Sequence, residues 1–169
     1  MRTPIPLAER KWDYLFVGFF WLNLLLVTYI VDLEQLVIAD PNNFSYPRWP
    51  PRFMVDAIHW WSRTYDHDQM AREMWWKMTI WIDVLLFGPF YVAAIYAFTK
   101  GKDWIRVPSI IYASVLLTNV TIILGEEFFG AHPTPGPLPM IVANAPWVLV
   151  PLYLIARMWS AEHPFTRAT

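Results

Sequence analysis

The segment "TIWIDVLLFGPF", from Thr79 to Phe90, is apolar on both sides of a single carboxylate, that of Asp83. It belongs to a run over about 74–98 that is long enough for a membrane span, because a bilayer core of about 30 Å needs about 20 apolar residues. Asp83 comes about nine residues into this run, or ~14 Å along a helix. A carboxylate at the centre of a span costs on the order of 3 kcal/mol on insertion scales. Its presence there therefore needs a structural or functional reason.

Three more runs of this kind occur, over about 14–31, 104–124 and 138–159. Hydrophobic residues make up 56% of the 169 residues and charged residues only 16%, whereas soluble domains have about 25% charged residues. Tryptophan and tyrosine lie near several ends of the runs, as in the aromatic belts of membrane proteins. We therefore predict one all-α membrane domain over 1–169, an integral membrane four-helix bundle.

Basic residues predict the orientation of this bundle. They precede the first run, lie between the second and third, and follow the fourth, while the turn between the third and fourth has none. The positive-inside rule then places both termini in the cytoplasm. The absence of cysteine and of a dilysine signal in the C-terminal "HPFTRAT" favours a bacterial inner membrane over the endoplasmic reticulum. A net charge of −1 argues against a nucleic-acid partner.

The loop over about 33–73 is long for a small bundle. Its first part, "DPNNFSYPRWPPR", is rich in turn residues, and "FMVDAIHWWSRTYDHDQMAREMWW" then predicts an amphipathic helix at the membrane surface. Loops of this length are usually functional, often as lids.

Two interpretations of Asp83 remain open from the residues alone. In the first, Asp83 is protonated and hydrogen-bonded to Thr118, Asn119 or Asn144 of the other spans, which would be a structural contact. The other interpretation makes Asp83 part of a binding site, because ionisable residues inside a membrane usually mark one.

In the binding-site interpretation, Asp83 converges with Asp32 and Glu126 on a cavity and meets a cation or a developing positive charge. No lysine or arginine lies in the middle of any span to pair with these acids. Trp147 lies one turn after Asn144 on the same helix face, where its ring would suit a cation.

The tripeptide Asp66-His67-Asp68 has metal-ligand residue types, but three consecutive residues of a helix cannot point to one centre. His59 adds an imidazole without a zinc-site spacing. We therefore interpret this segment as a solvated helix face and predict no metal site. The chain also lacks the glycine and serine motifs of nucleotide-binding proteins and hydrolases, so we expect no cofactor.

The segments "KGKDWIRVPSIIYAS" (100–114), "NAPWVLVPLYLI" (144–155) and "FGPFYVAAIYAF" (87–98) resemble the EXPERA family, and most closely its sigma-two receptor branch. The resemblance covers nearly the whole chain. It implies a four-helix bundle whose intramembrane pocket binds sterols or cationic amphiphiles between two acids, which correspond here to Asp32 and Asp83. It also implies a structural role for Asp66.

The sterol isomerase branch of this family resembles the chain in a different way. Its fourth span carries N-A-x-W, matched by Asn144 and Trp147. Its first catalytic pair is a His with a Glu one turn later, and these positions hold Thr28 and Asp32 here. The Glu of its second span falls near Ile80, one turn before Asp83. The chain thus departs from the isomerase pattern at the His.

Three functions follow as hypotheses. The first is binding of a sterol-like or cationic hydrophobic ligand within the lipid membrane, with Asp32 and Asp83 at the charge and Asn144, Trp147, Thr118 and Tyr112 lining the pocket. The second is isomerisation of a sterol or terpenoid double bond, with Asp32 and Asp83 as acid and base. The third is a structural role as a small subunit of a larger complex. Small residues on helix faces and the family resemblance favour a homodimer.

Overall fold

The computed structural model describes residues 2–169, which form a predominantly helical molecule with almost no strand. Four helices are long and apolar enough to cross a membrane, at Asp13–Val37, Met74–Lys100, Asp103–Phe129 and Pro137–Trp159. The prediction of an all-α membrane bundle with four spans is therefore confirmed.

The first two spans each contain a π-helical segment. The first span comprises α1 (Asp13–Leu22), the π-helical η2 (Asn23–Asp32) and α2 (Leu33–Val37). The second comprises α5 (Met74–Ile82), the π-helical η3 (Asp83–Phe87) and α6 (Gly88–Lys100). Asp32 ends one π segment and Asp83 begins the other, and π turns inside helices occur frequently at functional sites.

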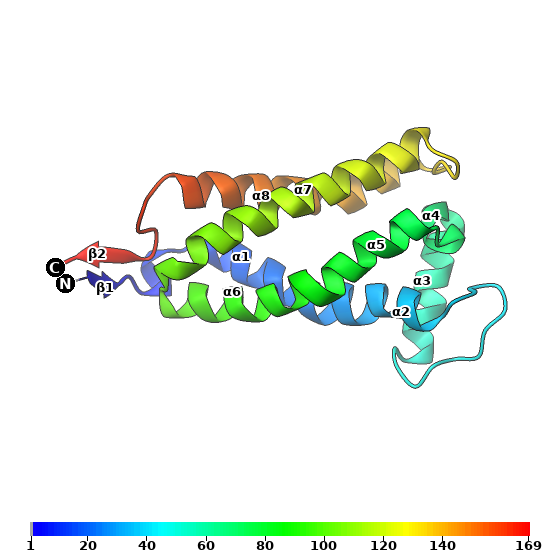
Figure 1. Cartoon of the computed structure of the whole chain (residues 1–169), viewed down its shortest axis with the longest axis horizontal. Coiled ribbons are helices and arrows are strands. Elements are labelled where there is room, and N and C mark those ends of the chain that lie inside the picture. The colour runs from blue at the N-terminus through cyan, green and yellow to red at the C-terminus, as the bar shows by residue number, and fades with distance from the viewer. Residues whose placement is uncertain (1) are drawn as a thin grey trace.

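The spans pack as two pairs. The third span is a short 3-10 turn, η4 (Asp103–Ile105), followed by α7 (Arg106–Phe129), and the fourth is α8 (Pro137–Trp159). Helix α8 packs along α7, while α6 packs along α1. Figure 1 shows the pairs meeting near the chain termini and diverging toward α3 and α4.

Aromatic side chains fill the end where the pairs meet. The Phe20 ring lies 5.4 Å from Phe98 and 6.1 Å from both Tyr91 and Tyr112, centroid to centroid. Strand β1 (Arg2–Pro4) pairs antiparallel with β2 (Thr166–Ala168), so both ends of the chain lie together (Figure 1). A short 3-10 turn, η1 (Leu7–Glu9), leads from β1 toward α1.

The opposite end is covered by the long first loop, which contains α3 (Arg52–Thr64) and α4 (His67–Ala71). The amphipathic helix predicted in this loop is present as α3, but it ends at Thr64, because the chain breaks between α3 and α4. The Oδ1 of Asp66 accepts a hydrogen bond from the backbone N–H of Gln69 at 3.0 Å and so caps the N-terminus of α4. Arg72, in the left-handed region at φ 50°, ends it.

The first helix continues past the span end predicted at about residue 31, because α2 extends it to Val37. Polar side chains of α2 face the protein interior and find partners there. Both Glu34 carboxylate oxygens accept from Nη2 of Arg72 at 2.8 Å, and His59 Nε2 lies 2.8 Å from Glu34 Oε1. We call Glu34, Arg72 and His59 the Glu34 cluster. Through this cluster, two residues of the loop contact α2 at the end of the first span.

The third span likewise runs past its predicted end at residue 124, to Phe129. Glu127, in this added turn, is fully buried, and its carboxyl group lies beside that of Asp66. A turn over 130–136 then leads to α8, and the Thr134 hydroxyl donates to the Tyr65 carbonyl at 2.6 Å. The third and fourth spans are therefore joined to the end of α3.

Candidate ligand-binding cavity

A cavity of about 410 Å³ lies where the two helix pairs diverge. Its wall comes from all four spans and from α3 and α4, and most of its lining side chains are apolar. No lysine or arginine occurs among the lining residues. A cavity of this size and character is in the range of small-molecule sites. Its polar and acidic lining residues are Asp32, Asp66, Gln69, Thr79, Asp83, Asn119 and Asn144.

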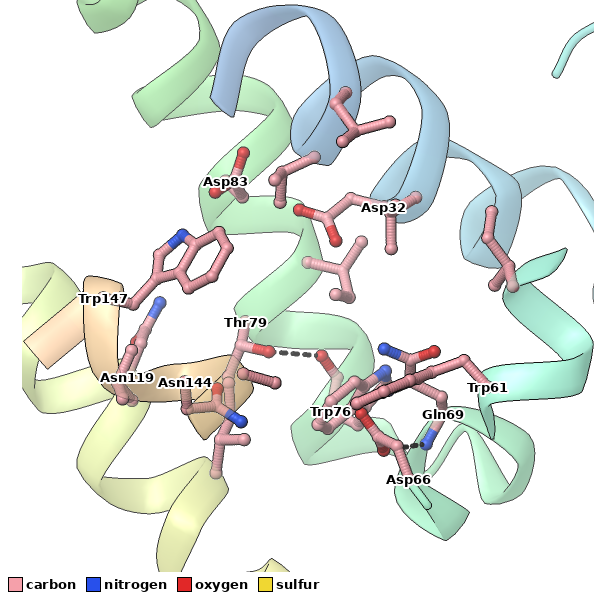
Figure 2. A pocket seen from close by; sticks show the side chains of 18 of the residues that line it. Asp32, Trp61, Asp66, Gln69, Trp76, Thr79, Asp83, Asn119, Asn144 and Trp147 are labelled. Carbon is pink, nitrogen blue, oxygen red and sulfur yellow. Dashed lines mark hydrogen bonds between the residues drawn. The ribbon is translucent and has the colours of Figure 1, made fainter. Parts of the chain in front are cut away.

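Asp32 and Asp83 reach the cavity from the neighbouring π segments η2 and η3. Figure 2 shows the two side chains near each other at one end of the cavity. The hydroxyl of Thr28, which is fully buried, donates a hydrogen bond to Asp83 Oδ1. Two carboxyl groups in apolar surroundings are stable only if they share protons or meet a cation. The end of the cavity is thus suited to a positive charge.

Trp147 presents its indole ring to the same end of the cavity (Figure 2). Its Nε1 donates to Asn23 Oδ1 at 2.7 Å. The Nδ2 of Asn144 donates to the Met140 carbonyl at 3.0 Å, within its own helix. The described structure gives the Asn119 amide no hydrogen-bond partner, although the side chain is 9% exposed and lines the cavity. Asn119 thus has unused hydrogen-bonding capacity toward a ligand.

The structure brings together Asp32, Asp83, Asn144 and Trp147, all of which the sequence analysis named. It does not place Thr118 at the cavity. That side chain faces outward from α7, and its hydroxyl donates to the Ser114 carbonyl at 3.0 Å.

Tyr112 and Glu126 also lie away from the cavity lining. Tyr112 belongs to the aromatic core, where it stacks on Phe90 at 4.3 Å and donates to the Tyr91 hydroxyl at 3.2 Å. Glu126 is half-buried near the end of α7 and accepts from the Ala131 amide at 3.4 Å. The expected convergence of Glu126 with Asp32 and Asp83 is therefore not seen.

Asp66 combines the cap of α4 with a place in the cavity wall, and burial raises its pKa. Burial, together with the nearby Asp66, also raises the pKa of Asp68 from 3.8 to about 6. These two residues are 5% and 2% exposed, so the solvated helix face expected here is wrong for both of them.

Among residues 2–169, no group of three His, Asp and Glu side chains is arranged to hold a metal ion.

The sequence analysis did not identify three features that support the cavity. They are the contact of Asn23 with Trp147, the hydrogen bond from Thr28 to Asp83, and the Glu34 cluster. A signal for Asn23 exists, since it is an amide inside an apolar run. The cluster gave little signal, because its members lie 13 to 38 positions apart in the chain and meet only in the folded loop.

The fold and the cavity define a class of multi-pass α-helical membrane protein with an acidic intramembrane cavity. A family model described as EXPERA (EXPanded EBP superfamily) matches residues 53–158, and the chain belongs to this family. The resemblance seen in the sequence is thereby confirmed.

Relatives with similar sequences agree over most of the chain. The sigma intracellular receptor 2 of Xenopus tropicalis is 28% identical over 165 residues, which cover 91% of each chain. The receptors of that name from Macaca fascicularis and Homo sapiens are 28% and 27% identical and cover about 90% of each chain. These relatives are all vertebrate proteins and lend no support to a bacterial inner membrane.

Proposed function

We propose that the chain binds a hydrophobic, sterol-like or amphiphilic ligand with a positive charge inside the membrane. The observation that carries this proposal is the cavity itself: mostly apolar, with two adjacent carboxyl groups and no basic lining residue. A cationic group of the ligand would lie at Asp32 and Asp83, while the Trp147 ring would add a cation–π contact. The apolar body would lie along Ile58, Leu116 and other apolar lining residues.

Membership of the EXPERA family and the names of the relatives support a receptor function. The packing also argues against the purely structural alternative. That alternative requires a cavity filled by the protein's own side chains and an Asp83 capped by Asn119. Here the cavity is open, and Thr28 is the partner of Asp83.

The test is equilibrium binding of a radiolabelled cationic amphiphile to purified protein. We expect saturable binding to the wild type and at least tenfold weaker binding to Asp83→Asn and Asp32→Asn, because each variant removes one carboxylate from the cation site. Asp56→Asn is the matched control, since Asp56 lies in α3 outside the cavity lining with a side chain 53% exposed. Equal binding by all four proteins would make the acids structural.

A second candidate is isomerisation of a sterol double bond, and the adjacent Asp32 and Asp83 favour it. One protonated carboxyl group would deliver a proton to an alkene carbon and form a carbocation. The other, ionised, would remove a proton from the neighbouring carbon and so shift the double bond. The isomerase candidate is weakened by Thr28, which occupies the position of the catalytic His in the isomerase branch. Incubation with a Δ8 sterol tests this candidate: a Δ7 product supports it, and no product with folded protein excludes it for that substrate.

A further inference from the structure

Asn23 is a fully buried amide in the apolar first span, where it begins the π-helical η2. A buried amide is costly unless it is hydrogen-bonded. Its Nδ2 donates to the Phe19 carbonyl at 2.7 Å, which turns the amide oxygen outward from its own helix. That oxygen accepts from Trp147 Nε1 at 2.7 Å, across 124 positions of sequence. The amide therefore connects the first span to the fourth.

This contact limits the orientation of the Trp147 ring. Indole has one N–H donor and no acceptor, so its single hydrogen bond determines how the ring lies. The ring of Phe19, 6.0 Å away at a tilt of 58°, supports the indole beside this hydrogen bond. Trp147 and Asp83 line the same cavity (Figure 2), so an indole released from Asn23 would be free to turn its N–H toward the cavity. In that orientation the ring face would no longer be directed at the bound cation.

We infer that Asn23 is a positioning residue: it holds the Trp147 indole so that the ring face, rather than its N–H, meets a cation bound at Asp32 and Asp83. This inference rests on the proposed function. It assigns to Asn23 a selective effect on charged ligands, because cation–π attraction acts on a cation and not on a neutral group of the same shape.

The functional test compares a tertiary-amine amphiphile with its neutral carbon isostere. We expect Asn23→Leu, of similar size, to reduce the preference for the amine about tenfold and to change the affinity for the isostere little. In a Trp147→Phe background, Asn23→Leu should cause no further loss, because the donor is already absent. Equal loss for both ligands, or additive effects in the double variant, would overturn the inference. Thr121→Val is the control, since its hydroxyl bonds only to its own helix.

A second readout needs no ligand. In protein with ¹⁵N-labelled indoles, the Trp147 N–H resonance is identified by its loss in Trp147→Phe. We expect this resonance to shift and to exchange faster in Asn23→Leu, and to be unchanged in Thr121→Val. An unshifted resonance in Asn23→Leu contradicts the positioning role. Wild-type protein that binds no cation would instead refute the proposed function, even where the resonance shifts.

Discussion

Arg72 contacts Glu34 with both side chains at most 3% exposed, and this pair shows what a buried charge requires. Removing one partner leaves the other charged and buried. We expect Arg72→Ala to lower the free energy of unfolding by about 3–5 kcal/mol. Arg52→Ala, which breaks an ion pair with side chains 74% and 53% exposed, should cost less than about 1 kcal/mol. Denaturant unfolding in detergent measures both, and equal effects would contradict the structural role of the Glu34 cluster.

The raised pKa of Asp68, about 6, makes a pH-dependent prediction. Because its pKa in the folded state exceeds the ordinary 3.8, Asp68 stabilises the fold when protonated, and this contribution is lost as pH rises through 6. Asp68→Asn should therefore match the wild type near pH 4 and exceed its stability by about 1 kcal/mol at pH 7.5.

Thermal unfolding of the two proteins across this pH range gives the measurement. Asp40→Asn serves as the control, because Asp40 is exposed and its side chain bonds only to a nearby backbone amide. A constant difference between Asp68→Asn and the wild type at every pH would show that Asp68 does not carry the proton linkage.

Sequence reasoning placed Asp32, Asp83, Asn144 and Trp147 at one cavity because polar and aromatic groups in apolar runs are conspicuous. It chose Thr118 as a lining residue, whereas the structure turns Asn119 inward. Consecutive residues on a helix point in different directions, and only an amphipathic pattern tells which of them faces inward. In a membrane span the lipid face is as apolar as the core, so that pattern is absent.

At the scale of elements, Gly88 begins α6 where the second span passes close to the first. A Cβ at Gly88 would lie 2.8 Å from the Tyr29 hydroxyl and 3.3 Å from Thr28 Cγ2. We expect Gly88→Val to destabilise the protein by about 1–3 kcal/mol through overpacking. Because Thr28 holds Asp83, we also expect weaker amine binding.

Gly18→Ala is the comparison for this prediction, since a Cβ there meets no atom within 4 Å. It should leave stability unchanged or raise it by up to about 1 kcal/mol, because alanine favours a helix. Thermal unfolding and amine binding measure both variants. A Gly88→Val protein as stable as the wild type would mean that the two spans do not pack this closely.

The existence of the four spans was predictable, while their ends were not. Apolar length alone indicates a span, but α2 and the end of α7 carry acids that sequence alone assigns to water. Glu34 remains helical and buried because Arg72 reaches it from a loop distant in sequence. The break between α3 and α4 depends on the Asp66 cap, which the helical pattern of the segment concealed.

For the whole molecule, the paired strands β1 and β2 place both termini at one end and the loop with α3 and α4 at the other (Figure 1). The chain has no cysteine, so single cysteines can report topology. In sealed vesicles whose outer surface is the non-cytoplasmic face of the membrane, we expect a membrane-impermeant maleimide to label Asn42→Cys. Ala168→Cys should react only after permeabilisation, as cytoplasmic termini require. The reverse pattern would invert the predicted orientation, and labelling of both would contradict the four spans.

The two helix pairs meet through the aromatic core at the end with the termini, and α3 and α4 cover the other end. The cavity therefore lies between the pairs, with Asp32 and Asp83 in its wall. This arrangement places the acids away from the lipid-facing surface and makes the position of the bound ligand the central claim of the proposed function.

The most direct test of that claim is photo-crosslinking of a cationic amphiphile to the purified protein, followed by peptide mapping. We predict adducts on cavity residues such as Trp147, Leu116 and Ile80, which excess unlabelled amine suppresses and Asp83→Asn abolishes. Adducts confined to outward-facing residues such as Leu85 and Ile122, unaffected by competitor, would contradict a ligand site between the helix pairs.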